Sequence, residues 1–481
     1  MKTTAQIKAG LDHPVVDCDG HYLEFTPVVL DYVKDIGGAE TMRRFEATPF
    51  LDNLNRQSVA GIPLEQRRDS WIEKAHFWIY PQRNTLDRAT AHLPGLLSER
   101  LEAIGLDHTL LYPTDGNLIL AIEDDELRPI ACRAFNTYVS ELLDGYSRQM
   151  TPVALIPMQT PDEALAELDF AIHRLGFKAA VFQQTATRPI AKPAPGGATT
   201  RIEYFGIDAE YDYDPVWAAC VEHKMAVTFH GVGTGFAPWR NGSYSNHVFN
   251  RLGLGGSLFS RSAGALFLGG VTARFPDLRV AFLEGGVAWA CALFGQLASL
   301  WDKRNADAIQ DLDPRHLDRD LMFRLIDEYG DKRTLATIDR IRAAFDRERD
   351  LPRPVPIDDF SACGIEVASD IATRFVPNFY FGCEADDPTV VGAFHNDGMP
   401  FGARLRPVFG SDIGHFDVSD MEGVLHEAYE PLEHGAITAT DFRDFVFANA
   451  VRLHGGANPA FFDGTTVEDA AASLLVAEAR G

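Results

Sequence analysis

The sequence has few basic residues for its length, and this shortage excludes several classes of protein. It contains 44 lysine and arginine residues against 69 aspartate and glutamate residues, which gives a formal net charge of −25. A protein of that charge, with no local run of basic residues, is not expected to bind nucleic acid or an anionic membrane.

Long apolar runs and clustered cysteines are also missing. No stretch approaches the roughly 20 apolar residues that a membrane-spanning helix needs, and the first residues lack the apolar core of a signal peptide. The six cysteines include no CxxC pair, so they predict neither a disulfide framework nor a zinc ribbon. With 46% hydrophobic and 23% charged residues, the chain is expected to be a cytoplasmic globular protein.

The sequence does contain eight short apolar runs, separated by segments with helical periodicity. Such runs are typical of strands buried on both faces of a parallel sheet. They lie at 14–19, 107–113, 151–157, 178–183, 225–230, 279–284, 377–382 and 406–412. This alternation predicts an α/β protein with a (β/α)8 TIM-type barrel. An open doubly wound sheet is the weaker alternative, because no GxGxxG follows the first run.

We expect a single metal-dependent barrel domain over 11–460, followed by a C-terminal tail at 461–481. Two intervals between the predicted strands are too long for ordinary barrel connections and are expected to be structured. The interval 301–374 is strongly charged and is predicted to be helical. Both insertions offer extra surface on which a homo- or hetero-oligomer could form.

The other insertion, 30–106, is rich in aromatic residues. We expect it to form a cap or lid over the carboxyl ends of the strands, with Trp71, Phe77 or Trp78 bordering the pocket. Packing inside an ordinary cap would explain these aromatic residues equally well.

Acidic residues and histidines stand at the ends of four predicted strands, where a barrel of this kind carries its chemistry. Such residues seldom end a buried strand unless they are paired or bound to something. They are Asp19, His21 and Glu24 after the first strand, His230 after the fifth, Glu284 after the sixth, and Asp412, His415 and Asp417 after the eighth.

The concentration of carboxylates predicts a metal site. Two carboxylates 4 Å apart repel each other by roughly 4 kcal/mol at an effective dielectric constant near 20. No lysine or arginine lies at these strand ends, so a divalent metal is the simplest countercharge, and His21 and His230 add nitrogen ligands. Taken singly, each residue is equally well explained as a helix cap, a turn or a core histidine. Four residues are weaker candidates, each better explained as a surface residue or as a residue that supports the ligands: His415, Asp417, His395 and Glu384.

At these positions the chain resembles the amidohydrolase superfamily, in particular the branch that includes the metal-dependent aromatic-acid decarboxylases. The resemblance is carried by VVDCDGHYLE, TFHG, LFLGGVTARFPDLRVAFLEGG and FGSDIGHFD. It implies that Asp19 and His21 replace the usual His-x-His pair, and that His230 and Asp412 are metal ligands. It also implies that Asp412 moves protons, and Glu284 stands where many of these decarboxylases have a catalytic histidine.

Two hypotheses for the reaction follow, and both place a small-molecule substrate at the barrel mouth. The first is a dinuclear iron or manganese monooxygenase, which would use dioxygen to hydroxylate a small organic acid or acyl substrate. Its oxygen-rich ligand set is similar to carboxylate-bridged sites that activate dioxygen. That set comprises the metal ligands Asp19, His21, Glu24, His230, Glu284 and Asp412, with Glu284, Asp412 and His415 as catalytic residues.

The second hypothesis is a hydrolase or a non-oxidative decarboxylase that holds a single zinc or manganese ion. In that case Glu24 would be an ordinary acid in the first turn of a helix, and Glu284 would orient substrate or water. No convincing lysine to bridge two metals ends the fourth strand, since Lys178 begins it and Gln183 ends it. A third possibility is a non-catalytic subunit that supports an active partner. The intact set of candidate ligands argues against it.

Overall fold

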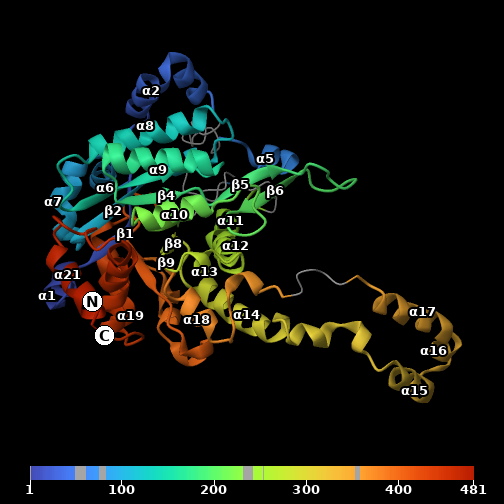
Figure 1. The fold of residues 1–481 in the computed structure, drawn as a ribbon. Coiled ribbons are helices and arrows are strands. Elements are labelled where there is room, and N and C mark those ends of the chain that lie inside the picture. The colour runs from blue at the N-terminus through green and yellow to red at the C-terminus, as the bar shows by residue number, and fades with distance from the viewer. Residues whose placement is uncertain are drawn as a thin grey trace.

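The computed structural model describes residues 2–48, 61–74, 83–230, 242–252, 254–352 and 358–480. Eight parallel strands form a barrel in the order in which they occur along the chain (Figure 1). They are β1 (Val16–Tyr22), β2 (His108–Pro113), β3 (Met150–Ile156), β4 (Ala179–Phe182), β7 (Val227–His230), β8 (Val280–Leu283), β9 (Phe379–Glu384) and β10 (Pro407–Gly410). The predicted (β/α)8 fold is confirmed, and each predicted strand overlaps one of these.

The barrel closes where the segment after β10 meets β1. The backbone N–H of Asp412 donates to the carbonyl of Asp19 over 2.9 Å, and that of His21 donates to the carbonyl of Ile413 over 2.7 Å. Gly414 follows with a φ of 97°, and a Cβ there would collide with the His21 carbonyl oxygen. Only glycine fits this turn without strain. The backbone therefore fixes the two strand ends that carry Asp19, His21 and Asp412.

Helices follow most of the strands and cover the outside of the barrel (Figure 1). Helix α9 begins after Thr160, whose side chain accepts the Glu163 N–H, and ends at Gly176 in a left-handed conformation. Both signals, a capping threonine before the helix and a glycine after it, are present in the sequence. The covering helices are α8 (Leu127–Leu142), α9 (Pro161–Leu175), α10 (Asp214–Glu222), α12 (Leu254–Leu268), α13 (Val271–Arg274), α14 (Ala288–Arg304), α18 (Asp370–Phe375) and α19 (Val424–Glu433).

The first long interval contains helices in the parts that the structure describes. These are α2 (Thr26–Glu46), α5 (Leu64–Ser70), α6 (Thr85–His92) and α7 (Pro94–Ile104). A feature that the sequence did not predict is the antiparallel hairpin of β5 (Thr185–Pro189) and β6 (Thr200–Tyr204) between β4 and β7. Its strands are short and partly exposed, so they lack the apolar run that marks a barrel strand.

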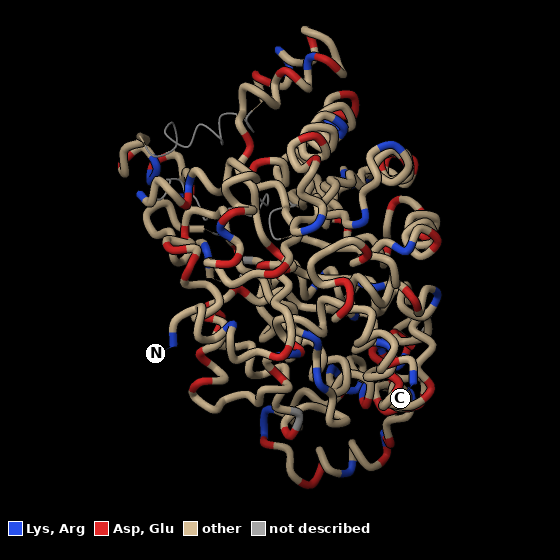
Figure 2. The backbone as a smooth tube through the Cα atoms, turned by 90° about the vertical axis from the view of Figure 1, so that its left-hand side faces the viewer, with Lys and Arg blue, Asp and Glu red and all other residues tan. Residues whose placement is uncertain are grey.

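The second long interval extends away from the barrel beyond α14 (Figure 1). It contains α15 (Arg319–Tyr329), α16 (Lys332–Ala336) and α17 (Ile338–Arg349). Figure 2 shows acidic and basic residues interspersed over the outer parts of the chain. In the described part of the chain, no helix is long and apolar enough to cross a membrane.

The chain ends in packed helical structure. Helix α20 (Ala439–Arg443) continues into two π-helical turns at Asp444–Ala448 and Val451–Gly455. The segment predicted as a tail contains α21 (Glu468–Glu478), which buries Ala471 and Leu474. Shorter helical elements are α1 (Thr4–Gly10), α11 (His247–Arg251), η1 (Gly116–Ala121), η2 (Ala308–Leu312), η3 (Pro314–His316), η4 (Ser361–Cys363), η5 (Pro388–Ala393), η6 (Asn396–Gly398), η7 (Pro400–Gly402) and η8 (Met421–Gly423).

Candidate metal centre

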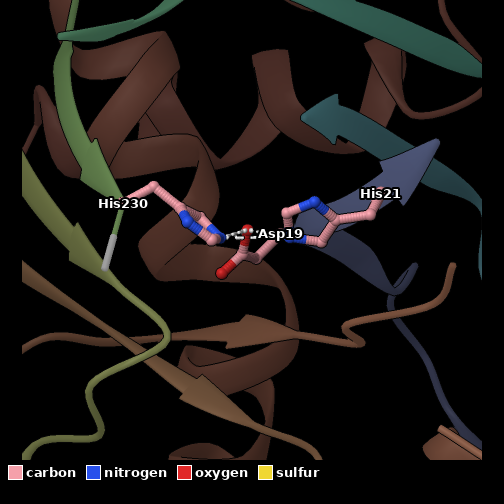
Figure 3. Close-up of side chains that lie close together, drawn as sticks. All are labelled: Asp19, His21 and His230. Atoms are coloured by element: carbon pink, nitrogen blue, oxygen red, sulfur yellow. Dashed lines mark hydrogen bonds and ion pairs between the residues drawn. The ribbon is translucent and has the colours of Figure 1, made fainter. Parts of the chain in front are cut away.

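Three predicted ligands meet at the carboxyl ends of β1 and β7. Asp19 and His21 are two residues apart in β1, so the alternation of the strand brings both side chains to the same side. The Oδ1 atom of Asp19 lies 3.4 Å from the Nε2 atoms of both His21 and His230. The two Nε2 atoms are 3.1 Å apart, and Figure 3 shows both rings turned toward the carboxylate. All three side chains are buried and could hold one metal ion.

Asp412 joins the same group from the end of β10. Its Oδ1 lies 3.4 Å from His21 Nε2 and 2.6 Å from His415 Nδ1, and the His415 ring stacks on His21 with 3.7 Å between centroids. Its backbone φ is 53°, an unfavourable value for a residue with a side chain. That strain turns the carboxylate toward the ligands of β1. We call Asp19, His21, His230 and Asp412 the donor pocket.

The chemistry of the donor pocket fits a divalent metal. Its members supply two carboxylates and two imidazoles, and Asp412 Oδ2 is buried with no hydrogen-bond partner among the described residues. A buried carboxylate oxygen without a donor is costly, and a metal ion would satisfy it. The imidazoles face inward through Nε2, the atom through which histidine commonly binds metal.

Without a cation, protons must balance the charge in the donor pocket. Burial opposes ionisation of Asp19, but His230 and His21 outweigh it and hold the pKa of this carboxyl below its usual range. Burial also opposes the charged form of His230, yet Asp19 and Glu284 raise its pKa to about 9. Burial, together with Glu284 and Asp417, raises the pKa of Asp412 well above its ordinary value. A bound cation would take over the role of these protons, so metal binding should release them.

Glu284 lies beside the donor pocket, outside both groups of candidate ligands that the described residues form. Its Oε2 is 3.7 Å from His230 Nε2, and its Oε1 accepts a hydrogen bond from Arg251 Nη2 over 3.0 Å. Burial opposes ionisation of Glu284, but Arg251 and His230 outweigh it and lower its pKa. Like Asp412, it has a positive φ, here 59°.

The presence of Arg251 corrects the expectation that no arginine reaches these strand ends. Arg251 ends α11, twenty-one positions after His230, so it did not belong to any strand end in the sequence. Its Nη2 also lies 3.7 Å from Glu384 Oε1 and 3.9 Å from Asp417 Oδ2. We call Arg251, Glu284, Glu384 and Asp417 the arginine cluster. Metal is therefore not the only countercharge at the mouth.

Glu24 lies apart from the donor pocket, and both of its oxygens have protein partners. Its carboxylate accepts the backbone N–H groups of Asp115 and Gly116, over 3.1 and 2.9 Å. Burial, with the charge of Asp115, raises the pKa of Glu24 to about 8. Glu24 thus ties the loop after β2 to β1, and its assignment as a ligand stays a prediction.

Sequence reasoning missed two polar residues that support the donor pocket. The Nδ2 atom of the Asn117 amide lies 3.3 Å from His230 Nδ1, a contact through which this side chain can hold the ring in place. Asp17 is fully buried and accepts from the side chains of Thr109 and Ser411, over 2.6 and 2.7 Å. The sequence signals were weak: Asn117 sits beyond the end of β2, and Asp17 looks like a further candidate ligand.

One part of the predicted lid can be placed. Trp71 packs edge-on against Tyr244, with 5.5 Å between ring centroids, and the backbone N–H of Lys74 donates to the Ser243 carbonyl. This portion of the insertion therefore lies against the segment that leads into α11 and Arg251. The other two lid residues, Phe77 and Trp78, lie outside the described residues, so the lid stays a prediction.

Comparison with known proteins assigns the family. Residues 16–335 match the family described as amidohydrolase, and the chain belongs to that family. A 209-residue stretch is 27% identical to decarboxylase orsB of Emericella nidulans, covering 41% of this chain and 57% of the relative. The chain thus spans less than two thirds of that curated relative.

The fold is shared with a solved amidohydrolase structure. The amidohydrolase map2389c of Mycobacterium avium subsp. paratuberculosis K-10 superimposes with a TM-score of 0.54 at 16% identity, covering 93% of this chain and all of that one. A dihydroxybenzoic acid decarboxylase of Polaromonas sp. JS666, solved with manganese and 2-nitroresorcinol, gives a TM-score of 0.49 at 14% identity, over 92% and 97% of the two chains.

These relationships confirm the predicted superfamily and the predicted fold. They support the coarser prediction of a metal-dependent enzyme of the amidohydrolase type. They do not support the preference for a dioxygen-dependent monooxygenase, because the named relative is a decarboxylase, which was the alternative.

Proposed function

We propose that this protein is a non-oxidative decarboxylase of a small carboxylic acid, dependent on one divalent metal ion. The observation that carries the proposal is the meeting of Asp19, His21, His230 and Asp412 around one small buried volume. These four side chains would hold the ion. When bound, it would supply a Lewis acid that binds the substrate carboxylate and draws electron density from it.

The protein residues provide the proton that decarboxylation requires. The bond between the substrate carbon and its carboxylate breaks, carbon dioxide leaves, and the electron pair remains on that carbon. A proton must then form the new C–H bond. Asp412 is placed to pass it to the substrate carbon, because its carboxyl lies in the donor pocket and contacts His415. His415, whose Nδ1 is 2.6 Å from Asp412 Oδ1, is placed to restore that proton.

The hydrogen bonds that Glu24 and Glu284 accept favour a site with one metal ion over a site with two. A dinuclear oxygenase needs Glu24 and Glu284 as additional ligands. Glu24 accepts two backbone N–H groups, and Glu284 Oε1 accepts from Arg251. Each would have to give up these partners to bind a second ion. The named relative, a decarboxylase, supports the same choice.

The test is turnover without dioxygen in deuterated water. The protein, loaded with manganese or zinc, is supplied with a panel of hydroxybenzoic acids in an anaerobic chamber, and carbon dioxide and product deuterium are measured. We expect carbon dioxide release and one deuterium at the carbon that carried the carboxylate. Asp412→Asn should reduce the rate by about 10²–10⁴-fold, the usual contribution of a positioned general acid.

The matched control is Asp386→Asn, which changes an exposed aspartate just after β9 and should leave the rate unaltered. Turnover that requires dioxygen would contradict the proposal and restore the monooxygenase hypothesis. Hydrolysis of esters or amides, with no decarboxylation of any acid in the panel, would favour a hydrolase instead.

A further inference from the structure

The arginine cluster places a cation where three carboxylates converge beside the donor pocket. Glu284 comes from the end of β8, Glu384 from the end of β9, and Asp417 from the loop after β10. One nitrogen of Arg251, Nη2, lies within 3.9 Å of a carboxylate oxygen of each. Three separate segments of the barrel mouth therefore share one guanidinium group.

Glu284 connects this cluster to the donor pocket. Its Oε2 faces His230 Nε2 at 3.7 Å, while its Oε1 faces Arg251 at 3.0 Å and His415 Nδ1 at 3.8 Å. The guanidinium is thus separated from the donor pocket by a single carboxylate. Dinuclear sites likewise hold two cations close together with carboxylates between them.

We propose that Arg251 acts as the built-in second cation of this site and limits the metal centre to one ion. A guanidinium remains charged at any physiological pH, so it offsets the carboxylates permanently. A metal ion in the same place would have to displace this charge and would meet strong repulsion from it. The inference rests on the single-ion site proposed above and concerns the number of ions that the chain can hold.

In α11, Arg251 lies on the partly buried side of the helix, together with His247 and Asn250. Val248, Phe249 and Leu252 are 62%, 57% and 72% exposed, whereas only 30% of the Arg251 side chain is exposed. A purely structural alternative follows, in which Arg251 only fastens α11 to the barrel. This alternative predicts a looser segment in an Arg251 variant, with no change in the number of ions.

The experiment counts manganese ions in the full-length protein. Wild type, Arg251→Met, Arg251→Gln and Arg251→Lys are loaded with Mn²⁺, freed of excess metal and measured by mass spectrometry. Electron paramagnetic resonance then distinguishes isolated ions from coupled pairs. Circular dichroism identifies the variants that fold.

We expect one ion per chain in wild type and in Arg251→Lys, which keeps the charge. We expect two coupled ions in Arg251→Met and Arg251→Gln, and a return to one when Glu284→Gln is added. One ion in the folded Met and Gln variants would overturn the inference and support the fastening role, as would two ions in wild type. If neither variant folds, wild type is titrated to saturating Mn²⁺, where a second, coupled ion would still overturn the inference.

The outcome is separable from that of the proposed function. Anaerobic decarboxylation is measured on wild type and on variants of Asp412 and Asp386, all of which keep Arg251, so a failure there leaves the ion counts of the Arg251 variants intact. Conversely, an unchanged count in Arg251→Met leaves the wild-type reaction unaffected.

Discussion

The two halves of the barrel mouth hold buried carboxylates in opposite ways. In the donor pocket, Asp19 and Asp412 face the Nε2 atom of His21, each at 3.4 Å. In the arginine cluster, Glu284 and its neighbours share a permanent cation that the chain itself supplies. One half is therefore left open to an external cation, and the other half already holds a cation supplied by the chain.

This difference shows why counting carboxylates overestimates the number of metal ions. From the sequence, Asp19, Glu24, Glu284 and Asp412 look equivalent, since each follows a barrel strand. In the structure, Glu24 accepts two backbone N–H groups and Glu284 accepts from Arg251, so their charge is offset by protein groups. A buried carboxylate points to a metal only when its surroundings provide no other donor or cation.

The largest expected effect on metal affinity and turnover comes from removing a histidine of the donor pocket. His230→Ala should lower metal affinity by more than about 100-fold and abolish turnover, because loss of residues that merely orient ligands already costs 10–100-fold. Urea unfolding should show that the barrel remains folded, since the side chain lies at the rim. Metal content is measured by mass spectrometry, with His395→Ala, an exposed histidine, as the control. Full metal content in His230→Ala would show that His230 is a core histidine.

A smaller effect on metal affinity is expected when Asn117, which contacts the ligand His230, is changed. Asn117 lies 3.3 Å from His230 Nδ1 and can fix the orientation of that ring. Asn117→Ala should weaken metal binding by about 10–100-fold and leave the ion count at saturation unchanged. Competition with a chelator of known affinity measures this. A metal affinity equal to that of wild type would show that Asn117 does not orient His230.

The smallest effect on metal binding is expected for Glu24→Gln. This substitution should instead change how the free energy of unfolding depends on pH. Burial raises the pKa of Glu24 to about 8 from its ordinary value of 4.5. Between these values the folded state binds the proton more tightly than the unfolded state, so the free energy of unfolding falls as pH rises. Glu24→Gln removes the titrating group and should make this dependence shallower while leaving metal content intact.

Urea unfolding of wild type and Glu24→Gln across that pH range provides the measurement. Comparing the two slopes cancels the contributions of other titrating groups. Identical slopes would show that Glu24 is ionised in the folded protein, and loss of metal in the variant would restore it as a ligand.

The strand ends could be predicted from the sequence because each depends on a local pattern. An apolar run followed by Asp19 or His230 locates both a barrel strand and its functional end, and the closed barrel then brings such ends together. Arg251 could not be predicted, because it reaches the mouth from a separate short helix through tertiary packing alone. The hairpin of β5 and β6 was missed for a related reason, since its partly exposed strands depend on pairing with each other.

The most direct test of the account is anomalous diffraction from crystals grown with manganese. The account predicts one anomalous peak, with Asp19, His21, His230 and Asp412 at ligand distance and the Arg251 guanidinium still against Glu284. Two peaks about 3.5–4 Å apart, with Glu284 or Glu24 as a ligand, would contradict it and establish the dinuclear centre.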